Sequence, residues 1–284
     1  MTGESSHAAE LAALARDARM LGELDQLFGM GVTPLPLLEP LHVPAPAREA
    51  EPAAGAAVSA ASGVRAPARE ATRPSPQRLP SRPESPQELE ARRSRNEQAL
   101  HELAGRLGGC ERCALHRGRT RLVFGQGDAA AELVFVGEGP GANEDQQGLA
   151  FVGRSGELLT KMIGAMGLGR DQVFICNVVK CRPPGNRAPA PDEMHTCLPF
   201  LREQLEVVRP RVICALGRTA AIGLGLLAPD ESLGARRGQF VDWHGIPTLL
   251  TFHPAYLLRA PEEKRKAWQD LQRLFPYLER RSTS

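Results

Sequence analysis

Residues 132–141 read Glu-Leu-Val-Phe-Val-Gly-Glu-Gly-Pro-Gly, a short apolar run that ends in a glycine-rich turn. Short runs rich in β-branched and aromatic residues, bounded by glycine and proline, are typical of buried strands. Because apolar and polar residues do not alternate in the run, both faces of this strand are expected to be covered. The sequence therefore predicts a strand over residues 132–137, inside a sheet with helices on both sides.

Three further runs of the same kind follow, at residues 173–179, 212–216 and 248–252. Helical patterns precede, separate and follow the strands, at residues 86–107, 156–166, 192–208, after 217, and 261–278. Strands that alternate with helices are typical of a parallel sheet whose connections cross over its faces. We therefore expect an α/β fold with four parallel strands, in which Ser155 caps the helix at 156–166.

The N-terminal part of the chain differs in composition from the rest. Residues 43–86 hold nine prolines and twelve alanines but no aromatic residue. Such a segment cannot bury enough apolar surface to offset the entropy of ordering, so we predict a disordered linker. Residues 1–42 precede it and carry an amphipathic helical pattern from Ala8 to Met30, which either packs on the body or docks a protein partner. Residues 87–284 are expected to form the folded domain.

Composition excludes several classes of protein. With 35 Lys and Arg against 33 Asp and Glu, the chain is neither an acidic disordered protein nor a histone-like one, although a local basic rim could still bind DNA. No run approaches the roughly 18 apolar residues of a membrane span, and the N-terminus lacks a signal pattern. We therefore expect a cytoplasmic protein without membrane contact.

Glycine and polar residues gather where the predicted strands end. The first strand runs into the turn at 137–141, which includes Glu138, while the others end at Asn177, Gly217 and His253. The carboxyl ends of parallel strands meet at one edge of a sheet, where α/β proteins bind their ligands. The sequence therefore predicts a ligand site with a carboxylate, an amide and an imidazole at this edge.

The cysteines form a second constellation. Four of the six lie outside the predicted strands, and these are Cys110, Cys113, Cys181 and Cys197. A Cys-x-x-Cys pair followed by two more cysteines suits a four-thiolate site for zinc or for an iron–sulfur cluster, and the spacing does not choose between them. Cys176 and Cys214 fall inside apolar runs and are predicted to be inert core thiols.

Four motifs occur in a defined order, namely GEGPGANE at 137–144, FVGRSG at 151–156, NVVKCRPPGNR at 177–187 and HPA at 253–255. Together they resemble family 4, the iron–sulfur type, of the uracil-DNA glycosylase superfamily, over about residues 110–275. The resemblance implies a three-layer α/β/α sandwich around a four-stranded parallel sheet. It also implies a [4Fe-4S] cluster on the four cysteines and hydrolytic excision of uracil from DNA.

The chemistry of base excision assigns roles within these motifs. An excised base must leave the stack and be read in a pocket. Asn177 offers both a donor and an acceptor to the edge of uracil, and Phe151 can stack on the flipped ring. His253 can donate to uracil O2 while negative charge builds on the leaving base, and a backbone amide around Gly139 can add to this.

The motifs also suggest which residues orient the attacking water and which select uracil over thymine. Gly139 stands where the best-known branch of the superfamily carries an aspartate, which leaves Glu138 and Asn186 as candidates to orient the water. Glu144 resembles the acidic residue that the family places near the C5 edge of the base, where a thymine methyl group would collide.

DNA contact is expected from residues around the His253 motif. Arg259 belongs to a basic rim that can bind phosphates. The apolar residues at 255–258 are expected on an exposed loop that enters the duplex, with Tyr256 and Leu257 as wedge candidates. The expected substrate is single- or double-stranded DNA containing uracil, bound by a monomer. Two alternatives remain: a branch of the superfamily acting on a different damaged base, and a non-catalytic DNA-binding module.

Overall fold

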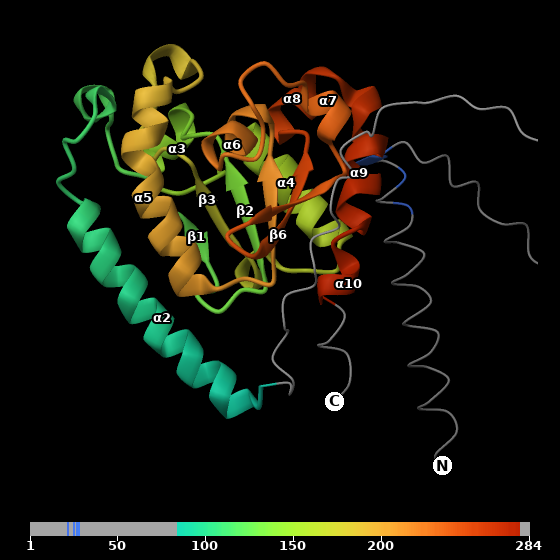
Figure 1. Ribbon diagram of the computed structural model, residues 1–284, viewed down its shortest axis with the longest axis horizontal. Helices are drawn as coiled ribbons and strands as arrows, with labels where there is room; N and C mark the ends of the chain where they lie inside the picture. The colour runs from blue at the N-terminus through green and yellow to red at the C-terminus, as the bar shows by residue number, and fades with distance from the viewer. Residues whose placement is uncertain (1–21, 23–24, 26, 29–83, 279–284) are drawn as a thin grey trace, which may run out of the picture.

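The computed structural model describes residues 22, 25, 27–28 and 84–278 (Figure 1). Nearly all of the linker predicted at 43–86, and most of residues 1–42, lie outside the described residues. No helix in the described part of the chain is both long and apolar enough to cross a membrane.

A six-stranded sheet lies at the centre of the described part of the chain, in the order β1-β3-β2-β4-β6-β5 (Figure 1). Its four middle strands all run parallel and are β3 (Phe174–Asn177), β2 (Leu133–Gly137), β4 (Val212–Leu216) and β6 (Ile246–Thr251). The four-stranded parallel sheet predicted from the sequence is thus confirmed as the core of a larger sheet.

Two antiparallel edge strands, β1 (Gln126–Gly127) and β5 (Phe240–Trp243), escaped the sequence prediction. β1 is only two residues long and consists of a glutamine and a glycine, so it contains no apolar run. β5 exposes part of its length to solvent, as edge strands do. Neither strand therefore shows the continuous apolar run by which buried strands are recognised.

Helices cover both faces of the sheet, because the strand side chains alternate between two apolar clusters. Val134 and Val136 face the side covered by α5 (Pro191–Val208) and α6 (Arg218–Gly223). Leu133 and Phe135 face the side covered by α4 (Arg154–Ala165), α8 (Pro254–Arg259) and α9 (Lys264–Gln272). The expected three-layer α/β/α sandwich is therefore confirmed.

Helix α2 (Pro86–Leu107) packs beside α5, and its predicted bounds are confirmed. The remaining α-helices of the described part of the chain are short. They are α3 (Ala142–Gln147), α7 (Leu233–Arg236) and α10 (Phe275–Leu278).

Two helix predictions were wrong in detail. The cap of α4 is Gly153 rather than Ser155, so the helix begins two residues earlier than the sequence suggested. The single helix expected at 261–278 is instead a 3₁₀ turn at Pro261–Glu263 followed by α9 and α10. The chain leaves the helix after Gln272, and Pro276 lies in the first turn of α10, where a proline is tolerated.

Two of the described residues of the N-terminal segment, Leu27 and Phe28, pack against the body. Phe28 is 3% exposed and stacks on Trp268 of α9, with ring centroids 4.8 Å apart. Stacked aromatic side chains of this kind bury a large apolar area. This contact favours the alternative in which the N-terminal helix packs on the folded domain, whereas a protein partner stays a prediction.

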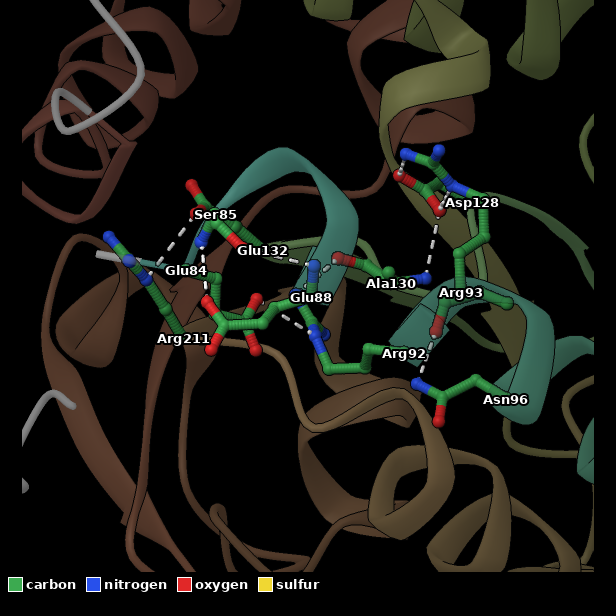
Figure 2. A network of polar contacts seen from close by, with 11 residues as sticks. Glu84, Ser85, Glu88, Arg92, Arg93, Asn96, Asp128, Ala130, Glu132 and Arg211 are labelled. Atoms are coloured by element: carbon green, nitrogen blue, oxygen red, sulfur yellow. Dashed lines mark hydrogen bonds and ion pairs between the residues drawn. The ribbon is translucent and has the colours of Figure 1, made fainter. Parts of the chain in front are cut away.

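Polar contacts fix α2 to the connection between β1 and β2 (Figure 2). The guanidinium of Arg93 donates to both carboxylate oxygens of Asp128, at 3.0 and 3.2 Å. Asn96 donates to the carbonyl of Ala129 at 2.9 Å, and Arg92 to that of Ala130 at 3.2 Å. Ser85 and Glu88 close a capping box at the start of the helix. These contacts hold the helix that leads to Cys110 and Cys113.

Asp128→Ala is expected to lower the free energy of unfolding by about 2 kcal/mol, because it removes a charge-assisted pair and an acceptor for the Ala130 amide. Urea unfolding of the full chain measures the change. Glu90, the exposed second partner of Arg93, supplies the matched control, since Glu90→Ala should cost less than about 0.5 kcal/mol. Equal losses in the two variants would contradict this account of how α2 is held.

Candidate functional site

The register between β2 and β3 places Gly137 opposite Asn177 at the carboxyl edge of the sheet. A Cβ atom on Gly137 would lie 2.4 Å from Asn177 Oδ1 and 2.5 Å from Phe151 Cζ. The missing side chain of Gly137 therefore makes room for both. The structure thus brings Asn177 and Phe151 together, as the sequence predicted.

Phe151 adopts a left-handed backbone conformation, with φ of 53°. This conformation is costly for a bulky residue and persists only where the surroundings hold it. Gly156 makes this conformation possible, because a Cβ there would lie 1.9 Å from the Phe151 carbonyl oxygen. The loop that carries the aromatic ring is therefore fixed by its backbone rather than by its side chain alone.

Glu144 clamps the same loop to the glycine-rich turn. Its Oε1 accepts from the amides of Val152 at 2.9 Å and Gly153 at 2.8 Å, and its Oε2 accepts from the Gly141 amide at 3.1 Å. Three backbone amides on one carboxylate give it a positioning role that sequence reasoning missed. Its contact with the C5 edge of a base stays a prediction.

His253 caps helix α8 and faces Phe151, with ring centroids 5.6 Å apart. Its Nδ1 accepts from the Ala255 amide at 3.1 Å. Since Nδ1 is the acceptor, the proton of the neutral ring belongs on Nε2, which is then a donor. The helix cap thereby sets the tautomer.

The charge of His253 is also set by its surroundings. Burial, with a smaller contribution from the nearby positive charge of Arg259, lowers the pKa of His253 to about 4. The imidazole is therefore neutral near pH 7. The structure consequently offers a neutral Nε2–H donor beside the Phe151 ring.

Asn177 carries the observation that points to a ligand. The residue is 2% exposed, yet its Oδ1 has no hydrogen-bond partner within the described part of the chain. A buried acceptor without a partner is destabilising, and native proteins rarely keep one without a reason. An acceptor beside an aromatic ring and a donor suits a planar ligand that carries both an N–H group and a carbonyl group.

Other predicted site residues lie on the surrounding turns. Glu138 and Gly139 are partly exposed, and the Val179 amide bonds to the Glu138 carbonyl at 3.2 Å. Asn186 is exposed, with φ of 55°, and its Oδ1 accepts from Arg182 Nε at 2.8 Å. Their roles toward water stay predictions, as does the DNA contact of exposed Arg259.

The expectation of an exposed loop after His253 was wrong. Pro254 at the first helical position and the His253 cap begin helix α8 instead. Leu257 is 0% exposed and belongs to the core on the α4 side, so it is not available as a wedge. Tyr256 is 39% exposed on the same helix and stays the wedge candidate.

The four cysteines outside the strands line one small cavity that is partly open to solvent. Its walls also carry basic side chains, and these are Arg112, His116, Arg119 and Lys180. Arg119 Nη1 lies 3.4 Å from Cys181 Sγ. Cys176 and Cys214 are 0% exposed within the strands, as predicted. In the described residues no three ligand-type side chains already meet at a single metal position.

Comparison with known proteins agrees with this geometry. The profile of the uracil DNA glycosylase superfamily matches residues 124–272. The chain belongs to the uracil DNA glycosylase superfamily. A type-4 uracil-DNA glycosylase of Thermotoga maritima is 42% identical over 187 residues, which cover 65% of this chain and 97% of that protein. One from Saccharolobus solfataricus is 41% identical over 61% of this chain and 83% of that protein.

A second branch of the superfamily is more distant. A type-5 uracil-DNA glycosylase of Pyrobaculum aerophilum is 33% identical over 146 residues, which cover 46% of this chain and 64% of that protein. The higher identity and coverage of the type-4 proteins agree with the motif resemblance seen in the sequence.

His253 should make stability depend on pH, and His253→Asn isolates the effect because asparagine can still cap the helix. The lowered native pKa of about 4 means that the unfolded chain, with a histidine pKa near 6.5, takes up the proton first as the pH falls. From pH 7 to pH 5 the wild type should lose about 2 kcal/mol more unfolding free energy than the variant. Urea unfolding at several pH values measures both proteins. The same dependence of the unfolding free energy on pH in wild type and variant would refute a neutral His253 imidazole.

Proposed function

We propose that this chain excises uracil from DNA by hydrolysing the N-glycosidic bond and leaves an abasic site. The observation that carries the proposal is the unpartnered Asn177 Oδ1, buried beside the Phe151 ring and facing the edge where His253 lies. Uracil supplies an N3–H donor and flanking carbonyl acceptors on a planar ring. The names of the type-4 relatives support the same substrate.

Base recognition follows from these side chains. The amide of Asn177 accepts from uracil N3–H and donates to a neighbouring carbonyl, which cytosine cannot match because its N3 lacks a proton. Phe151 stacks on the extruded ring, and such stacking offsets part of the cost of unstacking the base from the duplex. Glu144 holds the two residues that follow Phe151, and the missing side chain of Gly156 leaves room for the Phe151 carbonyl.

His253 supplies the stabilisation of the leaving group. Its neutral Nε2–H donates to uracil O2, where negative charge grows only as the glycosidic bond breaks. Preorganised donors of this kind are each worth about 3–4 kcal/mol in the transition state. The Ala255 amide on Nδ1 keeps the donor proton on Nε2 throughout.

Water then attacks the sugar carbon of an oxocarbenium-like species. Glu138 and Asn186 are the groups proposed to orient this water, and a backbone amide around Gly139 adds to the donors near the base. Arg259 and Tyr256, both exposed on α8, are proposed to bind a phosphate and to enter the duplex. Arg187 is paired with Glu193, and Arg119 lies against Cys181. Both guanidinium groups therefore already have partners inside the protein, which leaves them less available to bind phosphate.

The cavity formed by the cysteines suits a [4Fe-4S] cluster. The four thiols line one pocket, and the resemblance to the iron–sulfur family favours a cluster there over a single zinc ion. A cubane cluster distributes its four thiolates over four corners. Cys110, Cys113, Cys181 and Cys197 would hold it. When bound, the cluster would join the loop after α2 to the segment that follows Asn177.

The decisive assay is single-turnover cleavage of oligonucleotides, single- and double-stranded, that contain uracil, thymine, hypoxanthine or cytosine at one position. We expect abasic sites only with uracil. Excision of another damaged base in preference to uracil would assign the chain to a different branch of the superfamily. Binding without excision would make it a non-catalytic DNA-binding module.

Asn177→Ala should reduce single-turnover excision about a hundredfold, because one buried contact to the base is lost, while affinity for DNA changes little since phosphate contacts set it. Filter binding and quenched-flow cleavage measure the two quantities. Gln269→Ala, on the exposed face of α9, is the control and should leave both unchanged. Equal losses of affinity and rate would point to a folding role for Asn177.

Cys113→Ala should lose bound iron, whereas Cys214→Ala should keep it, because only the first side chain lines the cavity. Purification without oxygen and iron analysis should give about four irons per chain for the wild type and for Cys214→Ala. Zinc in place of iron, or full iron loading of Cys113→Ala, would overturn the cluster assignment.

A further inference from the structure

Lys180 is a buried lysine that contacts Asn177 and also lines the cysteine cavity. It is 1% exposed, and its Nζ donates to the backbone carbonyl of Asn177 at 2.7 Å and to Gln204 Oε1 at 2.5 Å. Gln204 is itself held, because its Nε2 donates to the carbonyl of Phe124 at 2.8 Å. The ammonium group therefore has a fixed position.

No carboxylate forms a salt bridge with Lys180 in the part of the chain that the structure describes. A buried charge is costly unless an opposite charge compensates it. Burial accordingly lowers the pKa of Lys180, and the thiols of Cys176 and Cys197 offset this only in part. Lys180 also lines the cysteine cavity, together with Cys197.

Lys180 also supplies a hydrogen bond that the sheet does not. β3 ends at Asn177, and the amides of Val178 and Val179 still bond to the carbonyls of Gly137 and Glu138 at 2.9 and 3.2 Å. The carbonyl of Asn177 is instead bonded to Lys180 Nζ. The direction of the peptide that follows Asn177 therefore depends on the ammonium group.

We propose that Lys180 is a positioning residue that couples the group held by the cysteines to the reading of the base. Lys180 lines the cysteine pocket, and its Nζ holds both Gln204 and the Asn177 carbonyl, so the bond to that carbonyl aims the Asn177 side chain. The inference rests on the proposed function and deepens it. Removing the ammonium should slow base excision without weakening the contacts that bind DNA.

The test compares Lys180→Met and Lys180→Gln with Lys161→Met, an exposed lysine on α4 that serves as the control. All variants are full-length and iron-loaded. Single-turnover excision should fall at least tenfold in both Lys180 variants, while affinity for the same duplex without uracil stays within twofold. Lys161→Met should match the wild type. Glutamine retains hydrogen-bonding capacity without charge and is the milder change, so it decides the outcome if the methionine variant does not fold.

Hydrogen exchange supplies a readout independent of activity. Peptides that cover residues 174–180 should exchange faster in the Lys180 variants, because the amides of Val178 and Val179 lose their anchored neighbour, while α9 stays unchanged. Wild-type excision by Lys180→Gln, or unchanged exchange at 174–180, would overturn the coupling. A wild-type chain that excises no uracil would instead refute the proposed function, and the exchange experiment would still test the anchoring of Asn177.

Discussion

The pairing of Gly137 with Asn177 is the constraint on which the site depends. Side chains alternate between the faces of a sheet, so a slip of one residue would turn Asn177 to the opposite face. The apolar residues of β2 and β3 prevent that slip, because each fits one of the two helical layers. The hydrophobic core thus fixes the orientation of the Asn177 amide, the proposed reader of the base, and glycine at position 137 leaves space for it.

Around this pair, the groups of the site are held by backbone contacts. Glu144 accepts from three amides, Phe151 is kept in a left-handed conformation, and His253 caps the helix that follows it. The residues proposed to contact the base are therefore also residues on which the local fold depends. Such preorganisation lets the donors act without rearrangement when charge develops.

The four parallel strands, the layers and the grouping of four cysteines could be predicted from the sequence, because apolar runs and cysteine spacing are local signals. The clamp by Glu144 and the burial of Lys180 could not, because each depends on a partner brought near by the fold. The exposed loop expected at 255–258 failed for a different reason. Its apolar residues suggested a surface wedge, but they form a short helix whose Leu257 is buried in the protein core. The only sequence signs of that helix were the capping histidine and the proline after it.

Gly217, at the end of β4, limits how this site can change by mutation. Its φ is 90°, and a Cβ there would lie 2.8 Å from the Cβ of His253. Since every residue but glycine carries a Cβ, replacing the imidazole with another side chain does not relieve this collision. Single substitutions at position 253 can therefore alter the chemistry on the existing backbone, whereas a substitution at position 217 requires β4 and α8 to move apart. New activities on this scaffold are consequently reached through position 253 while glycine stays at 217.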